Sequence, residues 1–300
     1  MSAPDRMGDG STAGTVAVAV ATMWTKPDAV RPVDAAALDR SPDPAAWVSA
    51  MGPAGRADLD GRSLTQLLLG EPVTVLESVD GWCRVIAPNQ PSGADRRGYP
   101  GWVAAAHLAP TGVPEPDHVV DALFTGLRDA PGGAVVIAGV PLGTGLAAAG
   151  PAEGGWLPVT VPDHSRPLWT DGAVPGPVAA PTGAALVDVA RRFLGLPYVW
   201  GGLSGAGTDC SGLVHLTARR LGLLVPRDAA DQADALAPVD LGTERTGDVY
   251  VFARPGRRVH HIGFVVSPGV MVHACGTRGE VVEEPVTGER EATLVGARRL

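Results

Sequence analysis

Length, composition and charge set the first limits on this chain. Its 300 residues exceed what one small core needs and suggest two or three domains. The 40 glycines and 28 prolines predict many turns and short strands, while the 45% apolar content indicates a folded protein. A formal net charge of −8 argues against a nucleic-acid partner, which would favour a basic surface.

The beginning of the chain shows no pattern of an export signal. The first apolar run, residues 16–21, is short and follows a Gly-rich, acidic segment. No apolar run reaches the roughly 18 residues of a membrane span. The three cysteines are too few for a disulfide framework and contain no C-x-x-C pair. We therefore expect a cytoplasmic protein without a membrane partner, and the sequence gives no signal of its oligomeric state.

In chain order, residues 1–14 are polar and predict a disordered tail. Between 15 and 112, short alternating segments such as EPVTVLESV and GWCRVIAP, with Gly-Trp after a turn, predict a small β-barrel of the bacterial SH3-like kind. Within it, residues 42–61 are interpreted mainly as a loop. Residues 113–178 repeat the order of apolar strand, Gly turn and Gly-Trp, which predicts a second SH3-like barrel. The segment VPGPVAAPTG, 174–183, is a predicted linker.

From 184 to 300 the pattern changes to α+β. The segment ALVDVARRFLG has apolar residues at helical spacing and stops at Gly195. The loop LPYVWGG then leads to a second amphipathic helix, DCSGLVHLTARRLG. Strand-like segments follow, among them DVYVFAR, VHHIGFVV and VMVHAC. We expect helices packed on an antiparallel sheet.

Cys210 is the candidate nucleophile of this last segment. It falls in the first turn of the second helix, directly after Asp209 in the N-cap position. The partial positive charge at a helix start stabilises a thiolate, which is the reactive form of cysteine. Cys275 and Cys83 lie within predicted strands, lack that environment, and are interpreted as packing residues.

A nucleophilic thiol needs a base, and the strand VHHIGFVV offers His260 and His261 on opposite faces. Alternation alone does not choose between them. Gly263 leaves room beside His261 for another group and mildly favours His261. His273, on the next strand, could orient that imidazole. No metal or cofactor is expected, because no His or Cys pair has the spacing of a zinc site.

The ordered segments YVWGGLSGAGTDCSGLVHL, GDVYVF, HIGFVV and MVHA resemble the NlpC-like cysteine peptidases, a papain-related family that cleaves peptidoglycan stem peptides. The resemblance covers residues 184 to about 295. It implies that Cys210 is the nucleophile and that His261, not His260, is the base. His273 would be the third, orienting member. With two SH3-like domains in front, the chain looks like the γ-D-glutamyl-L-diamino acid endopeptidases of the dipeptidyl-peptidase VI type.

The same resemblance implies a set of substrate-binding residues. The first SH3-like domain would hold a free N-terminal L-Ala of the murein peptide through Glu71 and Tyr99. In the catalytic domain, the positions matching the substrate cleft are Tyr198, Trp200, Asp209, Ser211 and Asp228. Ala229 stands where relatives commonly carry serine, which removes one hydroxyl contact with the substrate.

The expected function is cleavage of the bond between D-Glu and the diamino acid in small murein peptides with a free N-terminal L-Ala, in cell-wall recycling. Two alternatives stay open. One is an exported hydrolase that acts on intact peptidoglycan, and the other is a non-catalytic protein that only binds wall peptide. The choice between diaminopimelate and lysine, and the role of the second barrel, are also open.

Overall fold

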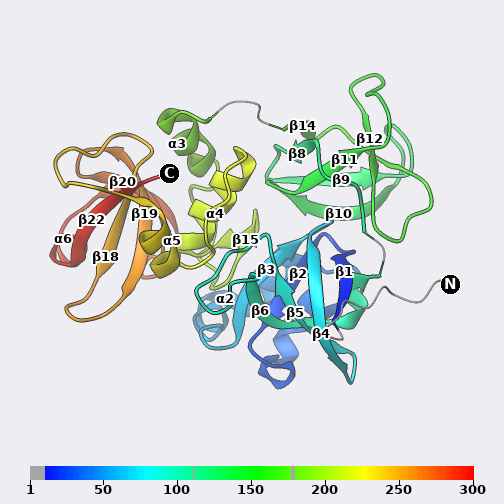
Figure 1. Ribbon diagram of the computed structural model, residues 1–300, viewed down its shortest axis with the longest axis horizontal. Coiled ribbons are helices and arrows are strands. Elements are labelled where there is room, and N and C mark those ends of the chain that lie inside the picture. The colour runs from blue at the N-terminus through cyan, green and yellow to red at the C-terminus, as the bar shows by residue number, and fades with distance from the viewer. Residues whose placement is uncertain (1–10, 111, 177–179) are drawn as a thin grey trace. The chain divides into compact units, whose positions relative to one another are not determined.

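The computed structural model describes residues 11–110, 112–176 and 180–300, which divide at Gly176 into two compact units (Figure 1). The division falls inside the predicted linker 174–183, although strand β14 (Ala173–Pro175) occupies the first two residues of that segment. Within the described residues, no helix is long and apolar enough to cross a membrane.

The N-terminal unit begins with a seven-stranded antiparallel sheet in the order β3-β2-β6-β5-β4-β1-β7. Its strands are β1 (Thr12–Val16), β2 (Val20–Trp24), β3 (Ser63–Leu68), β4 (Pro72–Val79), β5 (Trp82–Ala87), β6 (Tyr99–Ala104) and β7 (Leu108–Ala109). Alternate apolar side chains such as Val85 and Val103 are fully buried in its core, together with Tyr99.

Strand β1 corrects the predicted tail. It starts at Thr12, inside the segment 1–14, because Ala13 and Gly14 pair with Thr74 and Val73 of β4. Polarity suggested disorder, but backbone pairing of β1 with β4 holds these small residues in place. The rest of the predicted tail, residues 1–10, lies outside the described residues.

A helix replaces most of the loop predicted at 42–61. Helix α2 (Pro44–Ala57) is kinked at Gly52, and Asp43 caps it by accepting a hydrogen bond from the N–H of Ala46 at 2.9 Å. Its Trp47 is buried and donates its indole N–H to buried Asp34 at 2.8 Å. Proline and glycine obscured the helix because they mark its first turn and its kink. The short helices nearby are η1 (Pro27–Ala29), η2 (Pro32–Asp34), α1 (Ala35–Leu38) and η3 (Ala105–His107).

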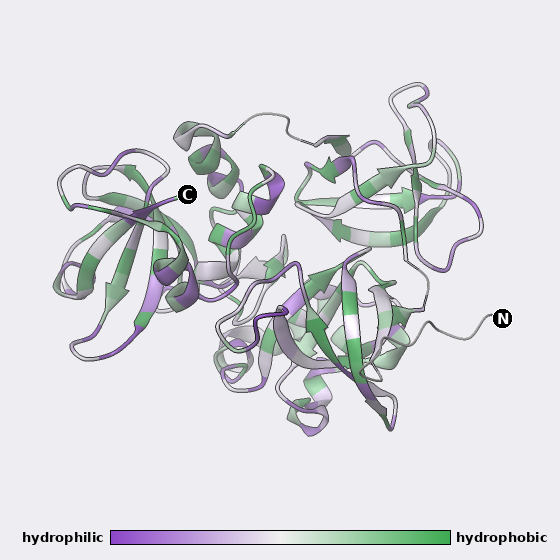
Figure 2. Cartoon of the chain, viewed as in Figure 1, coloured by the Kyte–Doolittle hydropathy of each residue, from purple (hydrophilic) through white to green (hydrophobic). Residues whose placement is uncertain are grey.

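A second seven-stranded antiparallel sheet completes this unit, in the order β10-β9-β13-β12-β11-β8-β14. Its other strands are β8 (His118–Val120), β9 (Phe124–Arg128), β10 (Val135–Pro141), β11 (Gly145–Ala148), β12 (Leu157–Thr160) and β13 (Leu168–Thr170). The antiparallel sheets agree with the expected SH3-like region. The boundary predicted at 112/113 stays a prediction. Figure 2 shows apolar residues along the strands and many hydrophilic residues in the connecting loops.

The C-terminal unit has the predicted α+β architecture. Helices α3 (Gly183–Arg191), α4 (Cys210–Arg220) and α5 (Ala229–Ala235) all contact β19 of a six-stranded antiparallel sheet. The sheet order is β17-β22-β18-β19-β20-β21. Its strands are β17 (Ala237–Val239), β18 (Val249–Ala253), β19 (Val259–Ser267), β20 (Val270–Cys275), β21 (Glu280–Pro285) and β22 (Leu294–Arg299), and the small elements are β15 (Leu203–Ser204), β16 (Gly207–Thr208) and α6 (Glu289–Thr293).

Candidate active site

Cys210 is the first residue of α4, as the sequence predicts. Asp209 is the N-cap and accepts a hydrogen bond from the N–H of Gly212 at 2.6 Å. A side chain at position 212 would not fit, because its Cβ would lie 2.5 Å from the carbonyl oxygen of Gly202. The glycine therefore lets the preceding loop close against the start of the helix that presents the thiol.

Asp209 is engaged by several groups besides its own helix. Arg227 binds both carboxylate oxygens, with Nη1 2.9 Å from Oδ1 and Nη2 2.8 Å from Oδ2. The N–H of Gly201 donates to Oδ2 at 2.8 Å, and the hydroxyl of Ser211 lies 3.3 Å from Oδ1. These contacts account for Asp209 as a helix cap and ion-pair partner. Its predicted contact with the substrate, like that of Ser211, stays a prediction.

Arg227 is a residue that the sequence reasoning missed. It is only 1% exposed and also donates to the hydroxyl of Ser211 at 3.1 Å. A buried bidentate pair of this kind fixes geometry, because removal of one partner leaves the other charge unpaired away from water. The signal in the sequence was the PRD segment just before α5, where only Asp228 was considered.

Burial of Cys210 opposes the thiolate that the helix start favours. Burial, followed by the charge of Asp209, raises the pKa of Cys210 to about 12. Hydrogen bonds from the backbone N–H groups of Ile262 and Ser211, and the charge of Arg227, act in the opposite direction. Desolvation outweighs these groups, so the thiol is protonated at neutral pH in the unliganded protein.

His261 and His273 form a hydrogen-bonded pair on neighbouring strands. His261 Nε2 lies 2.7 Å from His273 Nδ1, and the rings meet edge to face. His261 is 5% exposed and His273 is fully buried, whereas the His260 side chain lies on the solvent side. The space expected beside Gly263 is used by His273, whose Cβ would lie 2.7 Å from a Cβ at position 263.

Glu284 extends this pair and sets its proton arrangement. His273 Nε2 lies 3.2 Å from Glu284 Oε1, and Arg278 Nε lies 2.8 Å from Glu284 Oε2. Because a carboxylate only accepts, His273 carries its proton on Nε2, and its Nδ1 then accepts the Nε2 proton of His261. The lone pair of His261 is thereby placed on Nδ1. Glu284 was missed because it comes from the following strand, β21.

Both imidazoles are neutral at neutral pH. Burial, followed by the charges of His273 and Arg290, lowers the pKa of His261 well below its usual value. Burial, followed by the charge of Arg290, lowers the pKa of His273 to about 4, although Glu284 acts against this shift. A neutral His261 with a free lone pair can accept a proton from the thiol.

The other predicted site residues are distributed over both units. Tyr198 is half-buried and its ring lies against Gly276, while Trp200 is 39% exposed. Asp228 is the N-cap residue of α5. Glu71 and Tyr99 belong to the N-terminal unit, where both are buried. The binding roles of these five residues stay predictions.

One group of side chains in the described part of the C-terminal unit could hold a metal ion. His273, Cys275 and Glu284 each offer a ligand atom within 4.8 Å of the others. Spacing along the chain did not reveal this group, because Glu284 lies on a different strand from the other two. In the structure, His273 and Glu284 already bond to each other.

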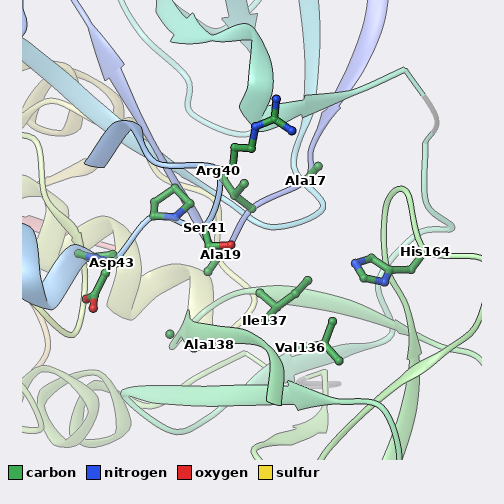
Figure 3. Close-up of a pocket in the computed structure, with 13 residues that line it drawn as sticks. Ala17, Ala19, Arg40, Ser41, Asp43, Val136, Ile137, Ala138 and His164 are labelled. Atoms are coloured by element: carbon green, nitrogen blue, oxygen red, sulfur yellow. The ribbon is translucent and has the colours of Figure 1, made fainter. Parts of the chain in front are cut away.

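A separate pocket of about 370 Å³ lies in the N-terminal unit, and none of the predicted site residues lines it. Figure 3 shows Val136 and Ile137 of β10 on one side of it and the turn at Ala17 and Ala19 on the other. The guanidinium of Arg40 points away from the β10 side chains in this view. The pocket is therefore not part of the candidate active site.

Comparison with known proteins gives the family. Residues 195–299 match the NlpC/P60 family, and residues 56–109 match the bacterial SH3 domain. A gamma-D-glutamyl-L-lysine dipeptidyl-peptidase of Bacillus subtilis is 35% identical over 277 residues, which cover 90% of this chain and 92% of that protein. The chain belongs to the NlpC/P60 family. It is accordingly a cysteine peptidase, as the sequence predicts.

Two further similar proteins support the assignment of this chain to the NlpC/P60 family. A gamma-D-glutamyl-L-lysine dipeptidyl-peptidase of Bacillus cereus is 28% identical over 285 residues, covering 86% of this chain and 81% of that protein. A crystal structure of an NlpC/P60 family protein from Bacillus cereus has a TM-score of 0.87 at 27% identity, covering 96% of this chain and 99% of the other. The predicted fold class, an NlpC-like domain after an SH3-like region, is confirmed.

Proposed function

We propose that this peptidase hydrolyses the bond between the γ-carbonyl of D-Glu and the diamino acid in murein peptides with a free N-terminal L-Ala. The observation that carries the proposal is the placement of Cys210 at a helix start beside β19, where its sulfur accepts a hydrogen bond from the N–H of Ile262, the residue after His261. Similarity along nearly the whole chain to two dipeptidyl-peptidases of this bond class supports the choice of substrate.

Catalysis starts from a neutral thiol and a neutral imidazole. His261 Nδ1 takes the proton of Cys210 as the sulfur attacks the γ-carbonyl carbon, and a C–S bond forms while the carbonyl oxygen becomes an oxyanion. The N–H of Cys210 at the start of α4 is a candidate donor to that oxyanion, because the N–H of Gly212 is already bonded to Asp209.

Collapse of the tetrahedral intermediate breaks the C–N bond. His261 passes its proton to the leaving amine, and a thioester remains on Cys210. His261 then deprotonates a water molecule that attacks the thioester, which releases L-Ala-D-Glu and restores the thiol. His273 holds the imidazole in the required tautomer throughout, through its 2.7 Å hydrogen bond to His261.

Carboxylate side chains of the protein would select substrates whose N-terminal L-Ala amine is free. By resemblance, Glu71 and Tyr99 of the SH3-like region would hold the L-Ala amine, with Asp228 contributing from the catalytic domain. An acetylated peptide offers no ammonium group to pair with these carboxylates, and an unpaired buried polar group costs about 1–3 kcal/mol. A cytoplasmic recycling role follows from this selection, since acylated stem peptides of intact wall would be poor substrates.

The test is product analysis by mass spectrometry. The protein is incubated with L-Ala-γ-D-Glu-diaminopimelate and with its N-acetylated form, and Cys210→Ala is the inactive control. Release of L-Ala-D-Glu from the free peptide alone supports both the bond and the amine selection. Equal cleavage of both peptides would favour an enzyme of intact wall and remove Glu71 and Tyr99 as selecting residues. Cleavage of neither would overturn the proposal.

A further inference from the structure

Three side chains next to the candidate base share one face of the C-terminal sheet. His273 and Cys275 lie two residues apart on β20, so their side chains point to the same side. Glu284 of β21 pairs with Met271, two residues before His273, and therefore lies diagonally beside His273 on that face. Strand register thus brings together an imidazole, a thiol and a carboxylate, whose ligand atoms all lie within 4.8 Å of one another.

The spacing of these atoms is close to that of a tetrahedral zinc site. With zinc bonds of about 2.0–2.1 Å to nitrogen and oxygen, the two ligand atoms lie about 3.3 Å apart. His273 Nε2 and Glu284 Oε1 are 3.2 Å apart, at the long end of the range for an N–H···O hydrogen bond. The sulfur of Cys275 lies within 4.8 Å of both atoms and would have to approach to about 3.6 Å. A zinc ion can therefore replace the proton between His273 and Glu284 with a small movement of side chains.

A metal ion can reach these atoms from the pocket beside His261. This pocket has a volume of about 550 Å³, and both Cys275 and Glu284 line it. His273 is fully buried, but Glu284, which its Nε2 contacts, opens onto the pocket. A water molecule from the pocket would complete the tetrahedron, as in zinc sites with three protein ligands and one open position.

The arginines of the pocket restrict which metal can bind. Arg278 Nε lies 2.8 Å from Glu284 Oε2, the oxygen that does not contact His273, and Arg290 Nη2 lies 3.6 Å from Cys275 Sγ. Both contacts can persist as outer-shell bonds to the metal-bound carboxylate and thiolate. Because the two guanidinium charges oppose any cation, we expect only a metal that binds thiolate and imidazole strongly, such as Zn²⁺, and not Mg²⁺ or Ca²⁺.

Metal binding at His273 Nε2 would reverse the tautomer of the candidate base. A neutral imidazole that binds a metal through Nε2 carries its proton on Nδ1. His273 Nδ1 would then donate to His261 Nε2 across their 2.7 Å contact, instead of accepting from it. In this exchange His261 Nε2 passes its proton to His273 Nδ1, and His261 Nδ1 takes up a proton from water. His273 Nε2 and Cys275 each release one proton to water. With Nδ1 protonated, neutral His261 has no lone pair for the proton of Cys210.

We propose that His273, Cys275 and Glu284 form an inhibitory Zn²⁺ site, in which the metal disables the peptidase without contacting Cys210 or His261. The metal site is independent of which peptide the enzyme cleaves. The inhibition rests on the proposed role of His261 as the base.

Zinc binding is measured first, in the variant Cys210→Ala, which lacks the candidate nucleophile. Competition with a chromophoric chelator should show one bound ion per chain. Adding Cys275→Ala should weaken zinc binding by at least about tenfold, because loss of a ligand costs no less than loss of an outer-shell partner. The matched control adds Cys83→Ala, which removes a buried cysteine of β5, and should leave the affinity unchanged. Equal affinity in all three proteins would overturn the site.

A cobalt spectrum covers the case in which Cys275→Ala does not fold. The chain has three cysteines, so Cys275 is the only one left in Cys210→Ala/Cys83→Ala. Co²⁺ bound to this double variant should show a thiolate-to-cobalt charge-transfer band, because Co²⁺ can take the place of Zn²⁺ at a thiolate site. Absence of the band would overturn Cys275 as a ligand.

Inhibition is then measured as kcat for L-Ala-γ-D-Glu-diaminopimelate at buffered concentrations of free Zn²⁺, starting from metal-free protein. At saturating zinc, kcat of the wild type should fall by about 100-fold or more, the usual contribution of a general base. Half-inhibition of Cys275→Ala should need at least about tenfold more zinc, whereas Cys83→Ala should behave as the wild type. Mg²⁺ and Ca²⁺ should have no effect.

Two results would overturn the inhibition through His273. Equal zinc sensitivity of Cys275→Ala and the wild type would place the inhibiting metal elsewhere, and relief of inhibition by saturating peptide would show that zinc only blocks the pocket. Failure of the proposed function gives a different result. If the metal-free wild type cleaves no peptide, the proposed function is overturned, and the binding and cobalt measurements still decide the metal site.

Discussion

The buried ion pair between Arg227 and Asp209 leads to a prediction about stability. Arg227 is 1% exposed, and its guanidinium binds both oxygens of Asp209 at 2.8 and 2.9 Å. Arg227→Met would leave a carboxylate buried without its counter-ion. We expect the free energy of unfolding of the C-terminal unit to fall by about 3–5 kcal/mol, the usual cost of breaking one side of a buried pair.

A control variant can separate this loss of unfolding free energy from a general effect of removing an arginine. Arg258 pairs with Asp231 and Asp234 at 3.0 and 3.1 Å, but its side chain is 69% exposed. Arg258→Met should therefore cost less than about 1 kcal/mol, as exposed pairs do. The double variant Asp209→Asn/Arg227→Met removes both charges and should recover part of the loss of Arg227→Met.

Urea unfolding followed by circular dichroism measures these differences, with midpoints and slopes compared between variants. The reasoning predicts a large loss for Arg227→Met, a small one for Arg258→Met, and partial recovery in the double variant. If Arg227→Met loses no more stability than Arg258→Met, the Asp209–Arg227 pair does not organise the start of α4. The account of Asp209 as a structural residue would then be wrong.

Three other predictions concern the site chemistry. The pKa of His273 is about 4 in the folded protein against about 6.5 unfolded, so the unfolded chain binds more protons between these values. Stability should thus fall as pH drops from 6.5 towards 4, which thermal unfolding at several pH values would show. A chelator should leave peptide hydrolysis unchanged, because the proposed steps use only Cys210 and His261; loss of activity restored by added zinc would contradict this. Glu284→Gln should lower kcat by about tenfold with little change in KM, because the carboxylate sets the tautomer of His273. It should also alter the acidic limb of the pH profile of kcat. An unchanged pH profile would show that Glu284 is only structural.

The sequence was sufficient where the signals are local. The signals for the start of α4 are local, because Asp209 is the N-cap and Cys210 directly follows it. The start of the helix and the place of Cys210 in its first turn could therefore be predicted directly. Similarly, helices α3 and α4 and strands β18, β19, β20 and β21 follow from hydrophobic periodicity. Helix α2 was missed because its proline and glycine residues are typical of loops. Its local signal was the N-cap at Asp43, which was not recognised.

Contacts between distant segments could not be predicted in the same way. Arg227 reaches Asp209 across 18 residues, and Glu284 reaches His273 from the adjacent strand. Both contacts depend on loop lengths and strand register, which no local pattern encodes. The choice of His261 over His260 by alternation also required knowledge of which face of β19 is covered by helices. The family resemblance supplied that choice, and the structure shows His261 buried against His273.

Burial of the thiol is a further property that the helix-start pattern does not encode. The helix start contributes a favourable partial charge, but burial raises the pKa of Cys210, and the carboxylate of the N-cap Asp209 next to the sulfur adds to this effect. In the proposed mechanism, Cys210 and His261 therefore meet the substrate as a neutral pair, and the ion pair forms only during attack. We therefore expect slow alkylation of Cys210 by iodoacetamide at neutral pH, and this result alone would not indicate a non-catalytic protein. Turnover of a peptide substrate is the measurement that separates a peptidase from a binding module.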